Sequence, residues 1–440
     1  MEIAIQAAQF FLSLSILVIL HEFGHFLPAR LFGMRVEKFY LFFDPYISLI
    51  KKKIGDTEYG VGWVPLGGYV KISGMIDESM DKEQMALPPQ PWEFRAKPAW
   101  QRLIVMIGGV TVNVILGVLI YWMVLFVYGE TILPAKEARH GIMCDSVALD
   151  MGLRNGDHIL ALDGKEVGSF TQIPLDIILN KVKDITVLRG NETLHVAVTE
   201  AQIGTLMRSK GFITPRVPFI AARFDKDLPA EKAGFMVGDS IVGINDSMVV
   251  FFDAFKTLLQ TYKGQTVNVN LYREGSPMVI SIAVPEKGQL GIFPSGDMSR
   301  WYHLQEVKYS FGESFPRAMK KAYGTFDGYI KQMSLIFSSE AKGYENVGGF
   351  ITIGSIFSPV WDWHQFWNIT AFLSIVLAFM NILPIPALDG GHVIFLLWEV
   401  ITGSKPSDKV LEVAQYIGMV LLLSLLVLAN GNDLYKLIFK

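Results

Sequence analysis

The residues with the clearest chemical potential lie near the N-terminus, where an apolar run ends in His21-Glu22-Phe23-Gly24-His25. Two histidines four positions apart project from one face of a helix, so both imidazoles can bind the same cation. Glu22 is placed to accept a proton from a metal-bound water. Ionisable groups inside an apolar span are costly and indicate function by default. A short buried helix of a soluble protein, with two hydrogen-bonded histidines, is the alternative.

A second polar cluster lies near the C-terminus, in the run Asn381-Ile-Leu-Pro-Ile-Pro-Ala-Leu-Asp389-Gly-Gly-His392. A catalytic zinc usually has three protein ligands and one open position, and spacing alone leaves the third ligand unassigned. The two prolines interrupt the helix and the two glycines permit close packing, which would turn Asp389 inward. Taken alone, this motif favours a simpler role for Asp389, as the N-cap of the next helix.

The composition indicates a membrane protein. Hydrophobic residues make up 51% of the 440 positions and charged residues 18%, whereas soluble proteins carry about 25% charge. The net charge of −3 provides no basic field for nucleic acid. Cys144 is the only cysteine, which excludes an intramolecular disulfide and a thiolate zinc site. The N-terminal run lacks the basic region of a cleavable signal, so we expect a retained span.

Four apolar runs approach the length of about 20 residues that crosses a bilayer: 3–27, 103–127, 366–385 and 413–428. The loop between the first two is rich in lysine and arginine, and the positive-inside rule therefore assigns it to the cytoplasm. Both termini and the long segment from about 129 to 364 then lie outside. The histidine motif falls near the cytoplasmic end of the first span.

The outside segment contains an internal repeat, because residues 148–164 recur as 230–246, a shift of 82 positions. Each copy reads as a short helix start, a Gly-Asp turn and an alternating strand. A period of this length indicates tandem domains and not a solenoid. The pattern Ala-x-x-x-Gly-(Leu/Phe)-x-x-Gly-Asp-x-Ile resembles PDZ domains, which bind extended chains by strand addition. Spacers that bind no ligand are the alternative.

Two further stretches suggest contact with the membrane. From Glu58 the sequence alternates like a strand pair that turns at Pro65 to Gly68, and it is apolar enough to dip into the bilayer. Its edge could pair with an unwound substrate strand, although a plain surface hairpin would read the same way. Residues 315–337 have the spacing of an amphipathic helix on the membrane surface, and packing against a PDZ-like domain is the alternative.

Taken together, the two polar motifs and the repeat between them resemble the site-2 protease family of intramembrane zinc metalloproteases. The similarity includes Asn113 in the second span and Pro65-Leu-Gly-Gly-Tyr-Val-Lys71, which looks like the family's membrane-associated β-loop. It implies a multi-pass α-helical membrane protein with about four transmembrane helices, that β-loop and two tandem PDZ-like α+β domains.

The resemblance also implies the role of individual residues. It assigns Zn²⁺ to three ligands: His21, His25 and Asp389. Glu22 would be the general base and acid, and Asn381 would position the substrate near the scissile bond. The β-loop would hold substrate by strand addition through Gly67, Gly68 and Tyr69.

The implied activity is intramembrane cleavage of single-span membrane proteins, with anti-sigma factors and signal-peptide remnants as typical substrates. The implied location is the bacterial inner membrane, with periplasmic PDZ-like domains, an active site towards the cytoplasm, and lipid and PDZ-binding segments as partners. Competing hypotheses are a catalytically silent membrane-anchored PDZ scaffold and a metal or proton transporter.

The chain departs from the family pattern at three places, and none of them is a proposed metal ligand: Leu41-Phe42-Phe43-Asp44-Pro45, Gly109-Val110 and Gly349-Phe350. These departures make the family's substrate-guiding details less transferable.

This interpretation divides the chain as follows: 1–28, first span with the zinc motif; 29–102, cytoplasmic loop with the β-hairpin; 103–128, second span; 129–212 and 213–295, PDZ-like domains; 296–364, extracytoplasmic linker with the amphipathic helix; 365–388, third span; 389–412, cytoplasmic loop; 413–430, fourth span; 431–440, tail.

Overall fold

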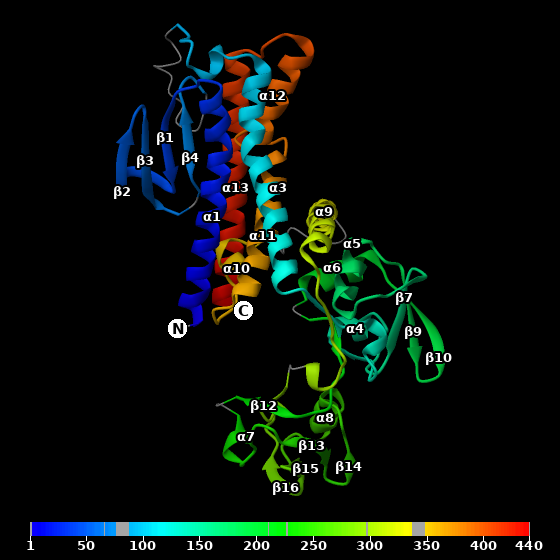
Figure 1. The fold of residues 1–440 in the computed structure, drawn as a ribbon. Coiled ribbons are helices and arrows are strands. Elements are labelled where there is room, and N and C mark those ends of the chain that lie inside the picture. Colours follow the sequence, from blue (N-terminus) through cyan, green and yellow to red (C-terminus); the bar gives the residue numbers. More distant parts are fainter. Residues whose placement is uncertain are drawn as a thin grey trace. The chain divides into compact units, whose positions relative to one another are not determined.

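The computed structural model describes residues 2–65, 67–75, 88–209, 211–225, 228–295, 298–336 and 348–439 (Figure 1). The chain forms two compact units. The first, here called the helical unit, comprises Met1–Gly129, Lys308–Ser334 and Tyr344–Lys440. The second, the repeat unit, comprises Glu130–Val307 and Leu335–Gly343.

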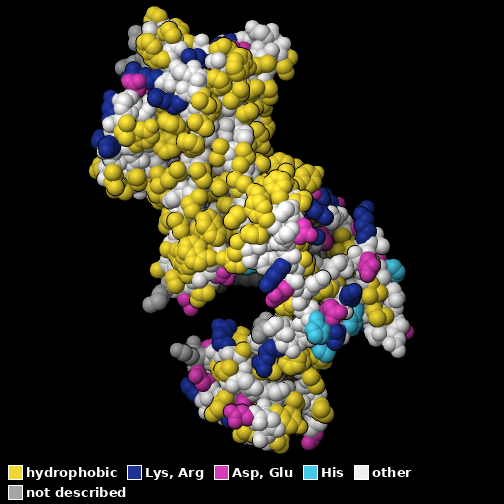
Figure 2. Space-filling view, in the orientation of Figure 1, with side chains coloured by type: hydrophobic (Ala, Val, Ile, Leu, Met, Phe, Trp, Pro, Cys, Tyr) yellow, Lys and Arg dark blue, Asp and Glu magenta, His cyan; other side chains and the backbone are white. Residues whose placement is uncertain are grey.

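The helical unit contains the four apolar helices that the sequence predicts: α1 (Glu2–Leu31), α3 (Ala99–Val127), α11 (Trp363–Ile382) and α13 (Asp408–Phe439). Each of them has a stretch long and apolar enough to cross a membrane, from Lys409 to Tyr435 in the case of α13. Hydrophobic side chains cover much of this unit's visible surface (Figure 2). The third helix ends at Ile382, earlier than the predicted 388, because Pro384 and Pro386 cannot continue its hydrogen-bond ladder.

Small residues allow α1, α3 and α11 to approach closely. A Cβ added to Gly24 of α1 would overlap the backbone of Gly108 on α3, and one added to Gly117 would lie 2.6 Å from Ile375 of α11. Polar contacts join the same helices, since Thr370 Oγ1 donates to Ser13 Oγ over 2.9 Å. Close backbone contact and interhelical hydrogen bonds are the usual means of helix association in lipid.

A four-stranded sheet follows α1 and corrects one prediction. Its strands are ordered β2-β3-β1-β4: β2 (Phe43–Ile54), β3 (Thr57–Val64), β1 (Val36–Leu41) and β4 (Tyr69–Ile72). Both predicted strands exist, but they do not form a hairpin, because β1 lies between them and pairs parallel with β3 and antiparallel with β4. Gly60 of β3 makes this possible, since an added Cβ would overlap the Tyr40 ring of β1. Leu66, in the predicted turn, lies outside the described residues.

Among the described residues, the remaining helices of this unit are α9 (Phe311–Ile336), α10 (Phe350–Gly354) and α12 (Asp389–Thr402), and the short helix η1 spans Phe94–Ala96. The predicted amphipathic stretch forms α9, except that Phe337 lies outside the described residues. One face of α9 packs on α11, where the rings of Phe326 and Phe379 are 5.4 Å apart. Asp433 near the end of α13 accepts hydrogen bonds from the Gly349 and Thr352 backbone N–H groups at the start of α10.

The repeat unit contains two copies of one topology. The first copy consists of β6 (Ile142–Cys144), α4 (Ser146–Asp150), β7 (His158–Leu162), β8 (Lys165–Glu166), α5 (Ile173–Leu179), β9 (Asp184–Arg189), β10 (Glu192–Ala197) and β11 (Ile213–Pro215). The second consists of β12 (Ala221–Phe224), α7 (Pro229–Lys232), β13 (Ser240–Ile244), β14 (Ser247–Met248), α8 (Phe252–Leu259), β15 (Thr266–Arg273), β16 (Ser276–Ala283) and β17 (Ile292–Pro294). The sheet orders β10-β9-β7-β8 and β16-β15-β13-β14 correspond strand for strand.

The two copies differ by one inserted helix, α6 (Glu200–Arg208), in the first. A capping box between Thr199 and Gln202 starts this helix, and Ile203 and Leu206 join the core of that copy. One strand precedes the two copies in the sequence and one follows them. These strands, β5 (Glu130–Ile132) and β18 (Gln305–Val307), pair with each other in antiparallel orientation. Each copy has its own apolar core.

Both copies carry the same ion pair between an arginine and a fully buried aspartate. Arg189 donates from Nε and Nη2 to the two carboxylate oxygens of Asp157, each over 2.8 Å, and also to the Gly152 carbonyl. In the second copy Arg273 makes the same three hydrogen bonds, to Asp239 and to the Gly234 carbonyl. The Gly-Asp motif of the repeat therefore has a structural role, because it anchors a turn to the neighbouring strand.

Candidate metal centre

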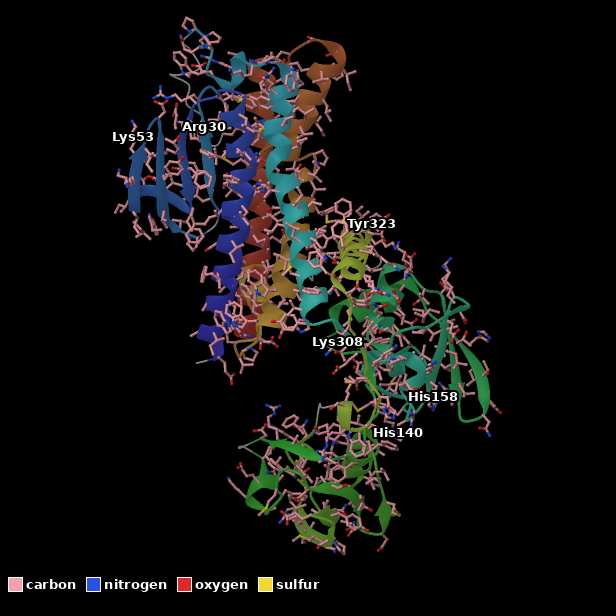
Figure 3. The ribbon with its side chains drawn as sticks, viewed as in Figure 1. Arg30, Lys53, His140, His158, Lys308 and Tyr323 are labelled. Atoms are coloured by element: carbon pink, nitrogen blue, oxygen red, sulfur yellow. The ribbon has the colours of Figure 1, made fainter. Side chains whose placement is uncertain are left out.

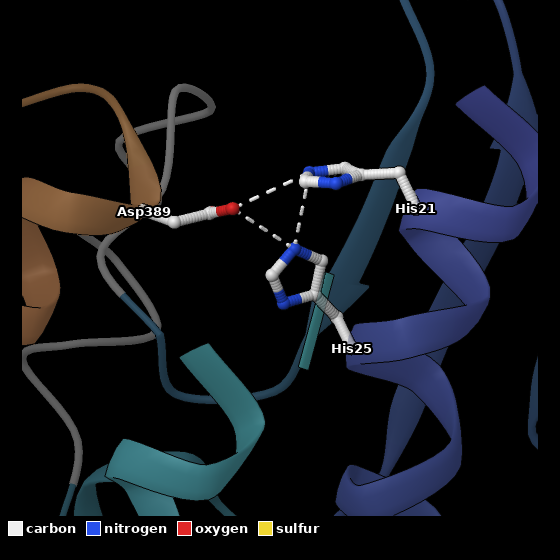
Figure 4. A group of neighbouring side chains, drawn as sticks. All are labelled: His21, His25 and Asp389. Atoms are coloured by element: carbon white, nitrogen blue, oxygen red, sulfur yellow. Dashed lines mark hydrogen bonds and ion pairs between the residues drawn. The ribbon is translucent and has the colours of Figure 1, made fainter. Parts of the chain in front are cut away.

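Two histidines of α1 meet an aspartate that is distant in the sequence inside the helical unit (Figure 4). Oδ2 of Asp389 lies 3.3 Å from Nε2 of His21 and 3.3 Å from Nε2 of His25. The two Nε2 atoms are themselves 3.3 Å apart. All three potential ligand atoms lie within 4.8 Å of one another, so a single ion can contact all of them.

Helix α1 presents both imidazoles on the face that packs against α3, as the four-residue spacing predicts. Both histidines are buried. Gly109 of α3 faces the two rings, and a Cβ at this position would lie 2.6 Å from Cε1 of His21 and overlap Nε2 of His25. A glycine is therefore required where α3 passes the histidine pair.

The Nδ1 atoms of both histidines have partners on α3. Nδ1 of His25 lies 2.8 Å from the Val105 carbonyl oxygen, and Nδ1 of His21 lies 3.0 Å from the Asn113 amide. Because a carbonyl only accepts, Nδ1 of His25 must carry the proton, which leaves the lone pair of Nε2 for a metal.

The chain between α11 and α12 brings Asp389 to the histidines. Ala387 has φ 82°, a left-handed conformation that costs a non-glycine residue about 1–3 kcal/mol. Gly391 fits against this turn, since an added Cβ would lie 2.6 Å from the Ile385 carbonyl oxygen. The N-cap alternative for Asp389 is wrong, because Leu388 occupies the cap position and Asp389 is the first helical residue.

The other predicted site residues lie close to this centre. Nδ2 of Asn381, at the end of α11, is 3.2 Å from Nε2 of His21. Glu22, Gly68 and Tyr69 line the same cavity of about 530 Å³ as the three clustered residues. Gly68 packs on α1, where an added Cβ would lie 3.3 Å from Cγ of Glu22. Gly67 is not among the lining residues; its φ of 155° shapes the turn that leads into β4.

The cavity wall also includes polar residues that sequence reasoning missed: Lys38, Asp44 and Gln415. Tyr69 donates from its hydroxyl to Oδ1 of Asp44 over 2.6 Å, and Lys38 Nζ lies 3.7 Å from the other carboxylate oxygen. Gln415 is 7% exposed on α13. A polar residue inside the fourth apolar run was the available signal for Gln415. No comparable signal pointed to Lys38 on β1 or Asp44 on β2.

Hydrogen bonding controls the ionisation of this wall. Burial works against the charge on Asp44, but hydrogen bonds from Tyr69 and Ser48 outweigh it and lower the pKa of the carboxyl. Burial and the bond to Asp44 both raise the pKa of Tyr69, so its hydroxyl stays protonated at neutral pH. The wall of the cavity therefore keeps a fixed carboxylate and a fixed phenol donor.

The clustered donors fit a zinc ion. Two imidazole nitrogens and one carboxylate oxygen are a known catalytic zinc set that leaves one position open for water. Oδ2 of Asp389 is buried and receives no hydrogen bond from the described part of the chain. A cation is the partner that such an oxygen lacks.

Comparison with known proteins agrees with this chemistry. A family model for peptidase family M50 matches residues 9–425. The chain belongs to peptidase family M50. The family resemblance inferred from the two polar motifs is thereby confirmed.

Relatives of this M50 peptidase match it over almost its whole length. The "Regulator of sigma E protease" of Haemophilus influenzae is 28% identical over 97% of this chain and 98% of its own. A "Putative zinc metalloprotease" of Vibrio cholerae is 28% identical with the same coverage. The "Regulator of sigma-E protease RseP" of Escherichia coli is 27% identical over 98% of each chain.

Proposed function

We propose that this M50 peptidase is an intramembrane zinc metalloendopeptidase that cleaves the transmembrane segments of single-span membrane proteins. The observation that carries the proposal is the convergence of His21, His25 and Asp389 on one point among membrane-spanning helices. These three residues are the zinc ligands. Bound zinc would lower the pKa of a water molecule to about 7 and polarise the scissile carbonyl.

The residues around the ligands perform the proton transfers. Glu22 takes a proton from the attacking water and gives it to the leaving amide nitrogen, which completes hydrolysis of the peptide bond. Its place in the cavity wall supports this role. Asn381, 3.2 Å from Nε2 of His21, is close enough to donate a hydrogen bond to a substrate carbonyl near the scissile bond.

Substrate is held as an extended strand. A transmembrane helix satisfies its own backbone hydrogen bonds, so it must unwind before a peptide bond can reach the centre. β4 is an edge of the sheet, and its residues Tyr69 to Ile72 line the cavity. Strand addition to β4, beside Gly68, would give the unwound segment new backbone partners. Gly67 allows the turn that places this edge next to α1.

The placement in the membrane follows from the same features. We assign the sheet and the cavity to the cytoplasmic side of the bacterial inner membrane, where cations such as Arg30 of α1 and Lys53 of β2 lie (Figure 3). Exposed apolar residues of β2, such as Tyr46 and Ile50, suit contact with lipid. Met319 and Tyr323 are exposed on α9, which supports a surface helix.

The repeat unit lies on the periplasmic side in this proposal, with PDZ-like domains at 129–212 and 213–295. Their matching strand order supports the tandem-domain interpretation. They would exclude bulky substrates and bind extended peptide segments. Anti-sigma factors and signal-peptide remnants are the proposed substrates, and the names of two relatives as regulators of sigma E support the former.

The scaffold and transporter hypotheses account less well for the centre. A scaffold has no use for two histidines and a carboxylate converging at membrane depth. Transporters often have related halves within the membrane, whereas the repeat here is confined to residues 142–294 of the repeat unit.

The test uses the full chain in detergent with a labelled single-span substrate. Cleavage within the span by the wild type, abolished by a zinc chelator and restored by zinc, is the expected result. Glu22→Gln should bind zinc without cleaving, whereas Asp389→Ala should do neither. Wild-type protein that binds no zinc under these conditions would sink the proposal. Zinc-dependent uptake by proteoliposomes containing Glu22→Gln would favour a transporter.

A further inference from the structure

We infer that Asn113 is a positioning residue for the metal centre. Its side-chain oxygen accepts a hydrogen bond from the Nδ1–H group of His21 and so directs the Nε2 lone pair towards zinc. This inference rests on the proposed zinc site. The relevant geometry is the 3.0 Å separation between the Asn113 amide and Nδ1 of His21.

Asn113 stands in the middle of α3, is 0% exposed, and lies within a helix otherwise apolar enough to span a membrane. Within the described residues, its side chain has one hydrogen-bonding partner, His21. In the structure, Nδ2 of Asn113 faces Nδ1 of His21, and Oδ1 is buried without a hydrogen-bonding partner among the described residues. Turning the amide over would leave Nδ2 unpaired instead, so neither orientation satisfies both atoms. A buried amide is costly, and the contact with His21 is the compensation that the fold supplies.

A metal bound by His21 would require one of the two orientations. Nε2 of His21 is the atom that lies 3.3 Å from Asp389, so it is the ligand atom. A neutral imidazole carries one proton, and a ligating Nε2 places that proton on Nδ1. Nδ1 then needs an acceptor, which Oδ1 of Asn113 provides and Nδ2 does not. Amide oxygen and nitrogen are interchangeable in shape, so the turn requires no other movement.

His25 shows the same arrangement with a partner that cannot turn over. Its Nδ1 faces the Val105 carbonyl, also on α3, over 2.8 Å. Val105 and Asn113 are eight residues apart, a little over two helical turns, and so lie on the same face of α3. One helix therefore supplies an acceptor for each ligand histidine, by a main-chain carbonyl in one case and a side chain in the other.

α11 holds Asn113 in place. Ser374 donates from Oγ to the main-chain carbonyl oxygen of Asn113 over 2.7 Å, and both residues are fully buried. Such outer partners of metal-bound histidines fix the tautomer and the ring orientation, and their loss typically weakens metal affinity about 10–100-fold.

The experiment measures zinc affinity of the detergent-solubilised full chain by competition with a chromogenic chelator. Asn113→Leu, which cannot accept a hydrogen bond from Nδ1 of His21, should weaken zinc binding about 10–100-fold. Asn113→Asp, which keeps an acceptor oxygen, should stay within about threefold of the wild type. Thr111→Val, an exposed position on the same helix, is the matched control and should not change zinc affinity.

Thermal unfolding of the zinc-free variants separates positioning from packing. A merely structural role would make Asn113→Asp at least as harmful as Asn113→Leu, because an unpaired buried charge is costly. Wild-type zinc affinity in Asn113→Leu, or equal losses in Leu and Asp variants, would overturn the inference while leaving the proposed function intact. If Asn113→Leu does not fold, Asn113→Ala takes its place with the same expected loss. A wild type that binds no zinc would refute the proposed function itself.

Discussion

The aspartates of the repeat's Gly-Asp motif and the aspartate of the candidate metal centre are used differently. In the repeat unit, Asp157 and Asp239 are each saturated by an arginine and by a backbone N–H group. In the helical unit, Asp389 and Asn113 each keep a buried oxygen without a hydrogen-bond donor in the described structure. Saturated groups hold a fold together, whereas unsatisfied groups at membrane depth require an external partner.

The contrast gives a practical criterion, because both kinds of site contain sequence motifs of similar appearance. The Gly-Asp motif of the repeat and the Asp-Gly-Gly motif of α12 each place an aspartate beside glycine. Only in the second does the carboxylate lie beside other atoms that can bind a metal, the Nε2 atoms of the two histidines. Substitutions at the metal centre should therefore reduce activity with little effect on stability, whereas substitutions in the Gly-Asp motif should reduce stability.

The largest effect is expected for Asp389→Ala. Removing a ligand should reduce zinc affinity by more than the about 10–100-fold expected for an outer partner. Peptide cleavage should fall to background, while the zinc-free protein unfolds at a nearly unchanged temperature, because the buried Oδ2 of the lost carboxylate receives no hydrogen bond from the described residues. Chelator competition and thermal unfolding measure the two quantities. A large fall in the zinc-free unfolding temperature would blur the contrast between the units.

Glu22→Gln should have the next largest effect. Loss of the proton acceptor should lower kcat about 10²–10⁴-fold. Zinc affinity should remain at the wild-type value, since Glu22 is not one of the three converging ligands. Single-turnover cleavage at saturating enzyme gives the rate, and retained cleavage would place the general base elsewhere.

Asp157→Asn should show the opposite behaviour, with wild-type zinc affinity and weakened folding of the first copy. The variant loses charge-assisted hydrogen bonds to Arg189, so local stability should fall by about 1.5–3 kcal/mol. Hydrogen exchange of β7 and β9 measures this opening. Asp150→Asn, at an exposed position of the same copy, is the control and should leave exchange unchanged.

Acid should weaken the second copy through Asp239. Burial opposes ionisation of this carboxyl, but the hydrogen bonds from Arg273 outweigh it and lower its pKa. Its contribution to stability is therefore complete above the unfolded pKa of about 3.9 and is lost as the pH falls through the lower folded value. Hydrogen exchange of β13, corrected for intrinsic rates, should rise below about pH 4. Asp239→Asn should remove that part of the pH dependence.

The smallest effect is expected for Tyr69→Phe in the cavity wall. Losing the hydroxyl removes a hydrogen bond to the Asp44 carboxylate. The loosened cavity wall should raise KM about 2- to 10-fold, a change of about 0.4–1.4 kcal/mol in binding free energy. Neither zinc affinity nor kcat should change, since the hydroxyl is directed at Asp44. A comparable fall in kcat with constant KM would show that Tyr69 acts on the chemical step.

The sequence predicted the local features well and the long-range ones only in part. Hydropathy was sufficient for the four apolar helices, and the spacing of His21 and His25 was sufficient for their common face. Alternation located β3 and β4 but not β1 between them, because alternation carries no information about which strands pair. The proposed ligand role of Asp389 required the family resemblance, since its local sequence favours a helix cap.

The missed residues have the same physical origin. Lys38 of β1 and Asp44 of β2 both line the cavity although β3 separates these two strands in the sheet, an arrangement that no local pattern encodes. Gln415 reaches the cavity from α13, a different helix from the one that carries Asp389 and His392. The inserted helix α6 was also missed, although Thr199 and Gln202 form a recognisable capping box at its start.

The two histidines and the aspartate of the proposed metal centre are synthesised at different times. Asp389 follows His25 by 364 residues. At a synthesis rate of about 5–20 residues per second, the ribosome needs roughly 20–70 s to add the last ligand after the first two. During that interval the nascent chain holds two imidazoles without their carboxylate. A protease synthesised in this order stays inactive until its third apolar helix, α11, has been made.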